Sequence, residues 1–132
     1  MNLNLRPATW TAAHADRFAA ACGSDPLCTP AVFGAMAAGG CPLLDVYDGE
    51  RCIGCVLLAL HHADREAVIV AGVGYCTLAQ LRGALRAVVG WCERAGFVHL
   101  RTHVQRPALA RVWAGLGFQQ SEIVMRRSHG QS

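Results

Sequence analysis

Cysteine and histidine are the residue types in this sequence that most directly suggest chemistry, because both can bind a metal ion. Cys52 and Cys55 are separated by two residues, the spacing found in one half of many zinc sites. They fall within a strand-like run, where residues three apart point to opposite faces, and no second pair has this spacing. His61 and His62 are adjacent and lack the i, i+4 spacing of a helical metal site. The sequence therefore predicts no metal centre.

The cysteines have a simpler interpretation as buried apolar residues. Their number, seven, is odd, and their spacings suit core positions rather than a disulfide framework. Free cysteine packs as a small hydrophobic residue, and free thiols persist in reducing compartments. We therefore expect free thiols and a cytoplasmic protein.

Length and composition predict one domain over residues 1–132, with 53% hydrophobic and 16% charged residues, which excludes a disordered chain. No apolar run is long enough to span a membrane, and the N-terminus has no apolar signal core. The net charge of +3 is spread along the chain without a recognisable nucleic-acid-reading motif. We expect neither a membrane nor a nucleic acid as partner.

Apolar spacing, turn residues and helix caps predict ten elements in the order β-α-α-β-β-β-α-β-α-β. The expected strands are 3–7, 43–47, 51–60, 67–73, 98–104 and 121–127. The expected helices begin after Thr9 or Thr11, at Pro30, near Leu78 and at Pro107, and end at Gly23, Gly39, Gly96 and Leu116. Residues 128–132 are expected to be a disordered tail.

The segment from Arg106 to Phe118 resembles the closing motif of the GCN5-related N-acetyltransferase (GNAT) superfamily. Gly117-Phe118 matches the end of that motif, whereas Arg106 replaces its usual Asn and Trp113 its usual Tyr. A second similarity is Leu5-Arg-Pro-Ala8 near the start of the chain. The resemblance implies an α/β fold with a mixed, mostly antiparallel central sheet flanked by four helices.

The resemblance also implies acetyl-CoA as cofactor, held where two central strands splay apart. The main chain of Ala71, Gly72 and Val73 would pair with its pantetheine arm. Its pyrophosphate would lie at the start of the long helix, where backbone N–H groups and the helix dipole attract anions. The residues implied there are Thr77, Leu78, Ala79, Gln80 and Leu81, with Arg82 as counter-charge, and the motif adds Arg106 and Trp113.

Members of this superfamily often use a Glu as general base and the motif Tyr as general acid. Glu66 is the base candidate here, with a solvated turn residue as the alternative interpretation. The indole of Trp113 cannot give up a proton at usable pH, so Tyr75 is the acid candidate, unless its hydroxyl only caps the turn.

Two functions are compatible with these residues. The first is direct acetyl transfer from acetyl-CoA to an unidentified small-molecule or peptide amine. The alternative is a catalytically inactive binding or assembly module, since the motif Asn and Tyr are both replaced. A homodimer through the alternating segment Glu122–Arg127 would suit the second function.

Overall fold

The computed structural model describes residues 1–22, 28–104, 107–121 and 125. Nine helices and strands lie within this part of the chain: β1 (Leu3–Pro7), α1 (Ala12–Ala21), α2 (Pro30–Ala38), β2 (Leu43–Asp48), β3 (Arg51–His61), β4 (Glu66–Gly74), α3 (Leu78–Arg94), β5 (His99–Thr102) and α4 (Pro107–Ala114). The predicted order is confirmed for these nine elements. The predicted strand 121–127 and the predicted tail 128–132 fall mostly or wholly outside the described residues.

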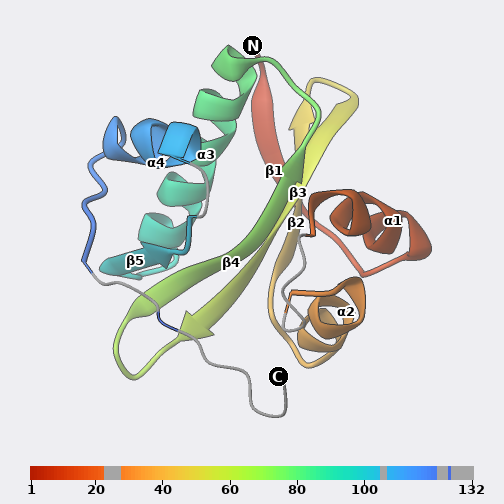
Figure 1. The fold of residues 1–132 in the computed structure, drawn as a ribbon, viewed down its shortest axis with the longest axis horizontal. Coiled ribbons are helices and arrows are strands. Elements are labelled where there is room, and N and C mark those ends of the chain that lie inside the picture. The colour runs from red at the N-terminus through yellow and green to blue at the C-terminus, as the bar shows by residue number, and fades with distance from the viewer. Residues whose placement is uncertain (23–27, 105–106, 122–124, 126–132) are drawn as a thin grey trace, which may run out of the picture.

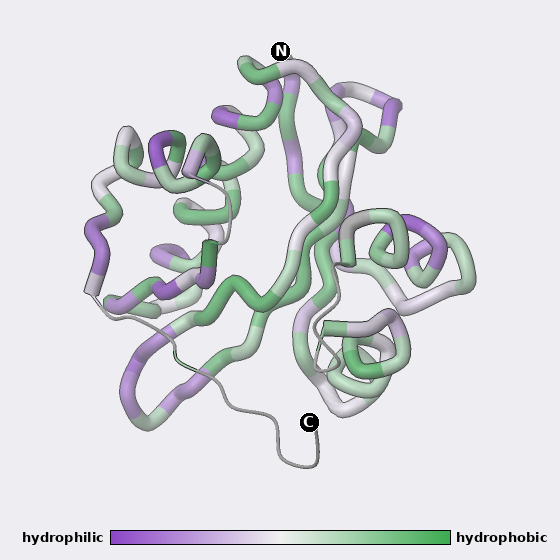
Figure 2. Tube along the Cα trace, in the orientation of Figure 1, coloured by the Kyte–Doolittle hydropathy of each residue, from purple (hydrophilic) through white to green (hydrophobic). Residues whose placement is uncertain are grey.

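The strands form one mixed sheet in the order β1-β2-β3-β4-β5, in which β1 to β4 are antiparallel neighbours and β5 runs parallel to β4. Helices α1 and α2 cover one face of this sheet, and α3 and α4 cover the other (Figure 1). Leu57 and Leu58 of β3 point to opposite faces, and both are 0% exposed. The centre of the sheet is therefore covered on both sides. Much of its central strands is coloured as hydrophobic in Figure 2.

Two β-bulges change which side chains share a face. The first lies at Val70 of β4, because Leu57 pairs with Ala71 whereas Leu58 pairs with Ile69. Val70 and Ala71 consequently both pack against the α1/α2 side, although they are adjacent in sequence.

The second bulge lies at Ile53 of β3, between the pairs Val46–Gly54 and Tyr47–Cys52. It brings Cys52 and Cys55 to the same face: Cys52 lies beside Arg17 of α1, and Cys55 packs in the cluster around Phe18 of α1. The expectation that these two thiols point to opposite faces is wrong, because a bulge resets the alternation. All seven cysteines are free thiols. Among the described residues, no group of three His, Cys, Asp or Glu side chains is placed to hold a metal ion.

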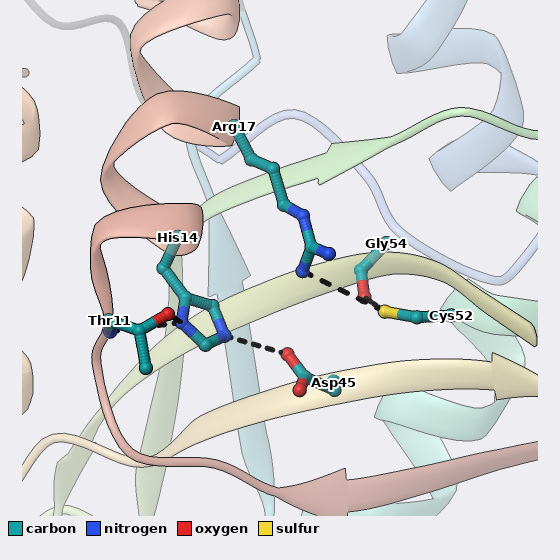
Figure 3. A network of polar contacts seen from close by, with 6 residues as sticks. All are labelled: Thr11, His14, Arg17, Asp45, Cys52 and Gly54. Atoms are coloured by element: carbon teal, nitrogen blue, oxygen red, sulfur yellow. Dashed lines mark hydrogen bonds and ion pairs between the residues drawn. The ribbon is translucent and has the colours of Figure 1, made fainter.

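Helix α1 is fixed to the sheet through His14, which is 5% exposed (Figure 3). The backbone N–H of Thr11, the N-cap residue, donates to His14 Nδ1 at 3.1 Å. A backbone N–H can only donate, so Nδ1 is an acceptor and the ring proton is on Nε2. Nε2 lies 2.9 Å from Asp45 Oδ1 on β2 and therefore donates to it. One side chain thus completes the helix cap and ties the helix to the sheet.

Candidate functional site

Strand β4 continues beyond its parallel partner and leaves part of one edge open. The pairing with β5 ends at Ile69 and Thr102, where the Thr102 hydroxyl donates to the Ile69 carbonyl at 3.4 Å. β4 runs on to Gly74, toward the start of α3 (Figure 1). From Val70 to Gly74 the β5-facing edge pairs with no strand in the described part of the chain.

The hydrogen-bonding phase of β4 decides which groups this edge presents. The N–H of Tyr75 donates to the carbonyl of Ile53, so Tyr75, Val73 and Ala71 belong to the pairs bonded to β3. The residues between them, Gly72 and Gly74, direct their N–H and C=O groups away from β3 toward the open edge. Of the three residues expected to pair with a ligand's main chain, Gly72 has its backbone groups at the open edge, whereas those of Ala71 and Val73 face β3. Gly74 also directs its backbone groups to the open edge.

Gly72 and Gly74 also leave an uncovered surface beside this edge. Ala67 and Ile69 pack on the α3/α4 side, and after the bulge at Val70 the alternation returns Gly72 and Gly74 to that side. Both glycines are exposed, and a Cβ atom would come no closer than 3.7 Å to other protein atoms at Gly72 and 3.4 Å at Gly74. The packing of the protein therefore does not require glycine at either position. The missing side chains leave room for an extended ligand.

The open edge leads to the N-terminus of α3, where a capping box uses two of the four free N–H groups. Thr77 Oγ1 accepts from the Gln80 N–H at 3.2 Å, and Gln80 Oε1 accepts from the Thr77 N–H at 3.0 Å. Within the described structure, the N–H groups of Leu78 and Ala79 remain for an anion. Both residues are exposed, as is Arg82 one turn further along the helix, whereas Leu81 is partly buried.

Gln80 also repeats at α3 the arrangement that His14 makes at α1. Its Nε2 donates to Asp48 Oδ2 at 3.0 Å, and Asp48 Oδ1 accepts from the Asn2 N–H at 3.0 Å. The Gln80 hydrogen bond, followed by that from Asn2, lowers the pKa of Asp48. Asp45 and Asp48 therefore each anchor one helix N-terminus, on opposite faces of β2.

The two residues expected to carry out acid–base catalysis lie far apart. Glu66 begins β4 and Tyr75 follows its end, so nine residues of extended chain, about 30 Å, separate them. Glu66 Oε1 lies 3.0 Å from Arg101 NH2, in an ion pair at the closed end of the sheet. The structure therefore does not bring Glu66 and Tyr75 into one site.

Tyr75 lies on the α1 side of the turn between β4 and α3. Tyr75 is 45% exposed, and the Arg17 guanidinium carbon lies 5.8 Å from the centroid of its ring. Burial raises the pKa of its hydroxyl, and the positive charge of Arg17 only partly opposes that shift. The phenol therefore stays protonated at neutral pH. Tyr75 lies five residues, or about 16 Å, beyond the bulge at Val70, where the open edge of β4 begins.

Of the two altered positions of the closing motif, Trp113 is among the described residues and Arg106 is not. Trp113 of α4 is 4% exposed and packs in the main core, with its ring 4.7 Å from that of Phe118. It is a core aromatic residue. Arg106 lies outside the described residues.

Sequence reasoning missed His14 and Thr102. Thr11-x-x-His14 has the spacing of a capping box, but histidine is not the usual residue at its fourth position. The role of Thr102 depends on where β5 separates from β4, which requires the register of two strands far apart in sequence.

No family model matches this chain, and no curated protein does so either. Solved structures do match. The ribosomal-protein-S18-alanine N-acetyltransferase from Escherichia coli aligns with a TM-score of 0.72 and 13% identity, over 91% of this chain and 79% of that one. The NatC complex bound to Gag peptide and CoA aligns with a TM-score of 0.68 and 15% identity, over 92% and 87% of the respective chains.

A GNAT family acetyltransferase from Streptococcus pneumoniae TIGR4 aligns over nearly the whole length, 96% of this chain and 99% of that one, with a TM-score of 0.64 and 9% identity. Similarity at these identities establishes the architecture. The chain has the GNAT fold, with a five-stranded, mostly antiparallel sheet between two pairs of helices in the part that the structure describes. No helix among the described residues is long and apolar enough to cross a membrane.

Proposed function

We propose that this protein is an acetyl-CoA-dependent N-acetyltransferase that transfers the acetyl group directly to an amine. The observation that carries the proposal is the open edge of β4, where Gly72 and Gly74 present bare surface and backbone groups that pair with no strand among the described residues. An extended chain containing amide groups can pair with such an edge as an added strand does. The pantetheine arm of acetyl-CoA has this chemistry.

The direction of the edge favours the same ligand. It leads to the free N–H groups of Leu78 and Ala79, with Arg82 on the following turn, and these groups suit a pyrophosphate. Leu78 is 53% exposed and adds apolar surface beside them. Proteins with the same fold include one named as an N-acetyltransferase and one named as a GNAT family acetyltransferase, and the NatC complex was solved with CoA.

The test is calorimetric titration of the protein with acetyl-CoA, comparing wild type with Gly72→Ala and Gly72→Val. A Cβ at Gly72 meets only ordinary contacts in the protein, so both variants should fold with an unchanged or slightly higher melting temperature. Affinity should fall stepwise as the side chain grows, by at least tenfold for Val. An affinity for acetyl-CoA that is unchanged in both variants would show that the ligand does not lie along β4 at Gly72.

Arg82 gives a second test with a matched control. Arg82→Glu reverses a charge beside the free N–H groups, whereas Arg86→Glu makes the same change one turn further along α3, at another exposed position. We expect Arg82→Glu to weaken acetyl-CoA binding about three- to tenfold more than Arg86→Glu, with the difference shrinking as salt is raised. Equal effects would show that Arg82 is not the counter-charge.

The alternative function, a catalytically inactive binding module, would be supported if the protein bound acetyl-CoA but released no CoA thiol with any amine. A homodimer through residues 122–127 stays a prediction, since that segment lies mostly outside the described residues. The seven free thiols favour a reducing compartment such as the cytoplasm.

A further inference from the structure

We propose that His103 is the general base that takes the proton from the acceptor amine. This inference rests on the proposed function, and it replaces Glu66 in that role.

Strand β4 supplies no acid or base near the place where the strands separate. From Ala67 to Gly74 its side chains are all aliphatic or absent. Glu66 is four residues, about 13 Å, before the bulge at Val70 and is paired with Arg101. A proton acceptor at the opening must therefore come from another element.

His103 directly follows Thr102, the last residue of β5 that pairs with β4. His103 therefore lies one residue past the last pair, Ile69–Thr102, at the point where the open edge of β4 begins with Val70. His103 is an exposed residue. Imidazole is the side chain best suited to proton transfer near neutral pH.

The side chain of His103 faces the side from which an amine would approach. Leu100 and Val104 pack into the core on the α3/α4 side, so the alternate positions Arg101 and His103 face the α1/α2 side. Gly72, Gly74 and the start of α3 place the acyl donor at the open edge and on the α3/α4 side. An amine reaching the thioester from the opposite side would meet His103. The other charged or titratable groups on this face of β4 and β5 are Glu66, Arg101 and His99.

Acetyl-CoA is a substrate in this reaction, since its acetyl group is consumed. The amine nitrogen forms a bond to the thioester carbonyl carbon, and the C–S bond then breaks with its electron pair left on sulfur. His103 accepts the proton that the amine nitrogen loses and returns it to the thiolate. The products are the acetamide and free CoA thiol, and the imidazole is regenerated.

The experiment compares wild type with His103→Ala, His103→Gln and the control His99→Ala. His99 is an exposed histidine on the same face of β5, but it pairs with Glu66 at the closed end of the sheet. Each protein is titrated with acetyl-CoA by calorimetry. CoA thiol release is then followed with a panel of primary amines: an amino-acid amide, a tripeptide with a free N-terminus, a polyamine and an amino sugar.

Both His103 variants should bind acetyl-CoA like wild type but lose about 10²- to 10⁴-fold in kcat/KM, with His99→Ala fully active. Millimolar imidazole should restore part of the activity of His103→Ala, and the fall in rate at acidic pH should disappear from both variants. These are effects that a purely structural histidine would not produce.

Activity of His103→Ala within about threefold of wild type would overturn the assignment. The assignment would also be overturned if the wild-type protein bound acetyl-CoA but released no CoA thiol with any amine. That result would leave the proposed acetyl-CoA site standing. Absence of acetyl-CoA binding by wild type would overturn the proposed function together with the base.

Discussion

At the scale of single residues, two glycines on neighbouring strands differ in whether the packing of the protein requires glycine. A Cβ at Gly54 would lie 2.5 Å from the Val73 carbonyl oxygen, whereas a Cβ at Gly72 would meet nothing closer than 3.7 Å. Gly54 is therefore required by the approach of β3 to β4, and Gly72 is not required by the fold at all. The distinction separates a glycine kept for packing from one available to a ligand.

We expect Gly54→Ala to lower the free energy of unfolding by about 1–3 kcal/mol, because backbone must move to admit the methyl group. Gly72→Ala should leave it unchanged or raise it slightly, since alanine restricts the unfolded chain more than glycine does. Urea unfolding of the two variants beside wild type makes the measurement. A similar loss of stability in both would show that the glycines are equivalent and that Gly72 is also a packing residue.

The residue scale is also where sequence reasoning was weakest. The bulges at Ile53 and Val70 depend on the partner strand, so the common face of Cys52 and Cys55 could not be read from one strand. Glu66 was chosen for its nearness to β4 in sequence, and the strand places it at the opposite end from Tyr75. Side chains that act together must be placed by register, which a local pattern does not contain.

At the scale of elements, the two capping boxes explain how the helices are held to the sheet. His14 and Gln80 each accept the N–H of an N-cap threonine and each donate to an aspartate of β2. Threonine caps, proline starts and glycine stops are local signals, which is why nine elements could be predicted within a few residues. The anchoring aspartates are about 30 residues away in sequence and could not be predicted.

This equivalence predicts the behaviour of two His14 variants. His14→Ala leaves the Thr11 N–H and Asp45 without their partner and should cost about 2–4 kcal/mol of stability. His14→Gln restores an acceptor and a donor of the kind that Gln80 uses, so it should recover more than half of the stability that His14→Ala loses. Urea unfolding at pH 8 makes the comparison. If glutamine proves as damaging as alanine, the contribution of His14 comes instead from its ring, which stacks on Trp10 at 5.9 Å.

At the scale of the whole molecule, two buried thiols should make the protein less stable in alkali. Burial raises the pKa of Cys55 to about 12 and that of Cys92 to about 11, against 9.0 for an unperturbed thiol. Between pH 9 and 11 the unfolded chain loses both protons while the folded chain keeps them. The unfolded state then binds fewer protons, so the free energy of unfolding falls as pH rises, by up to about 1.4 kcal/mol per pH unit for each thiol.

Urea unfolding at pH 8, 9, 10 and 11 measures this dependence, with Cys92→Ala as the test variant and Cys41→Ala as the control. Cys92 is 0% exposed, whereas Cys41 is partly exposed, and both are free thiols. Removing Cys92 should lower stability at pH 8 through loss of packing but make the decline above pH 9 shallower. Removing Cys41 should leave the decline unchanged. A slope that is the same in all three proteins would mean that the Cys92 thiol ionises as easily in the fold as outside it, which a sealed core between α3 and the sheet does not allow.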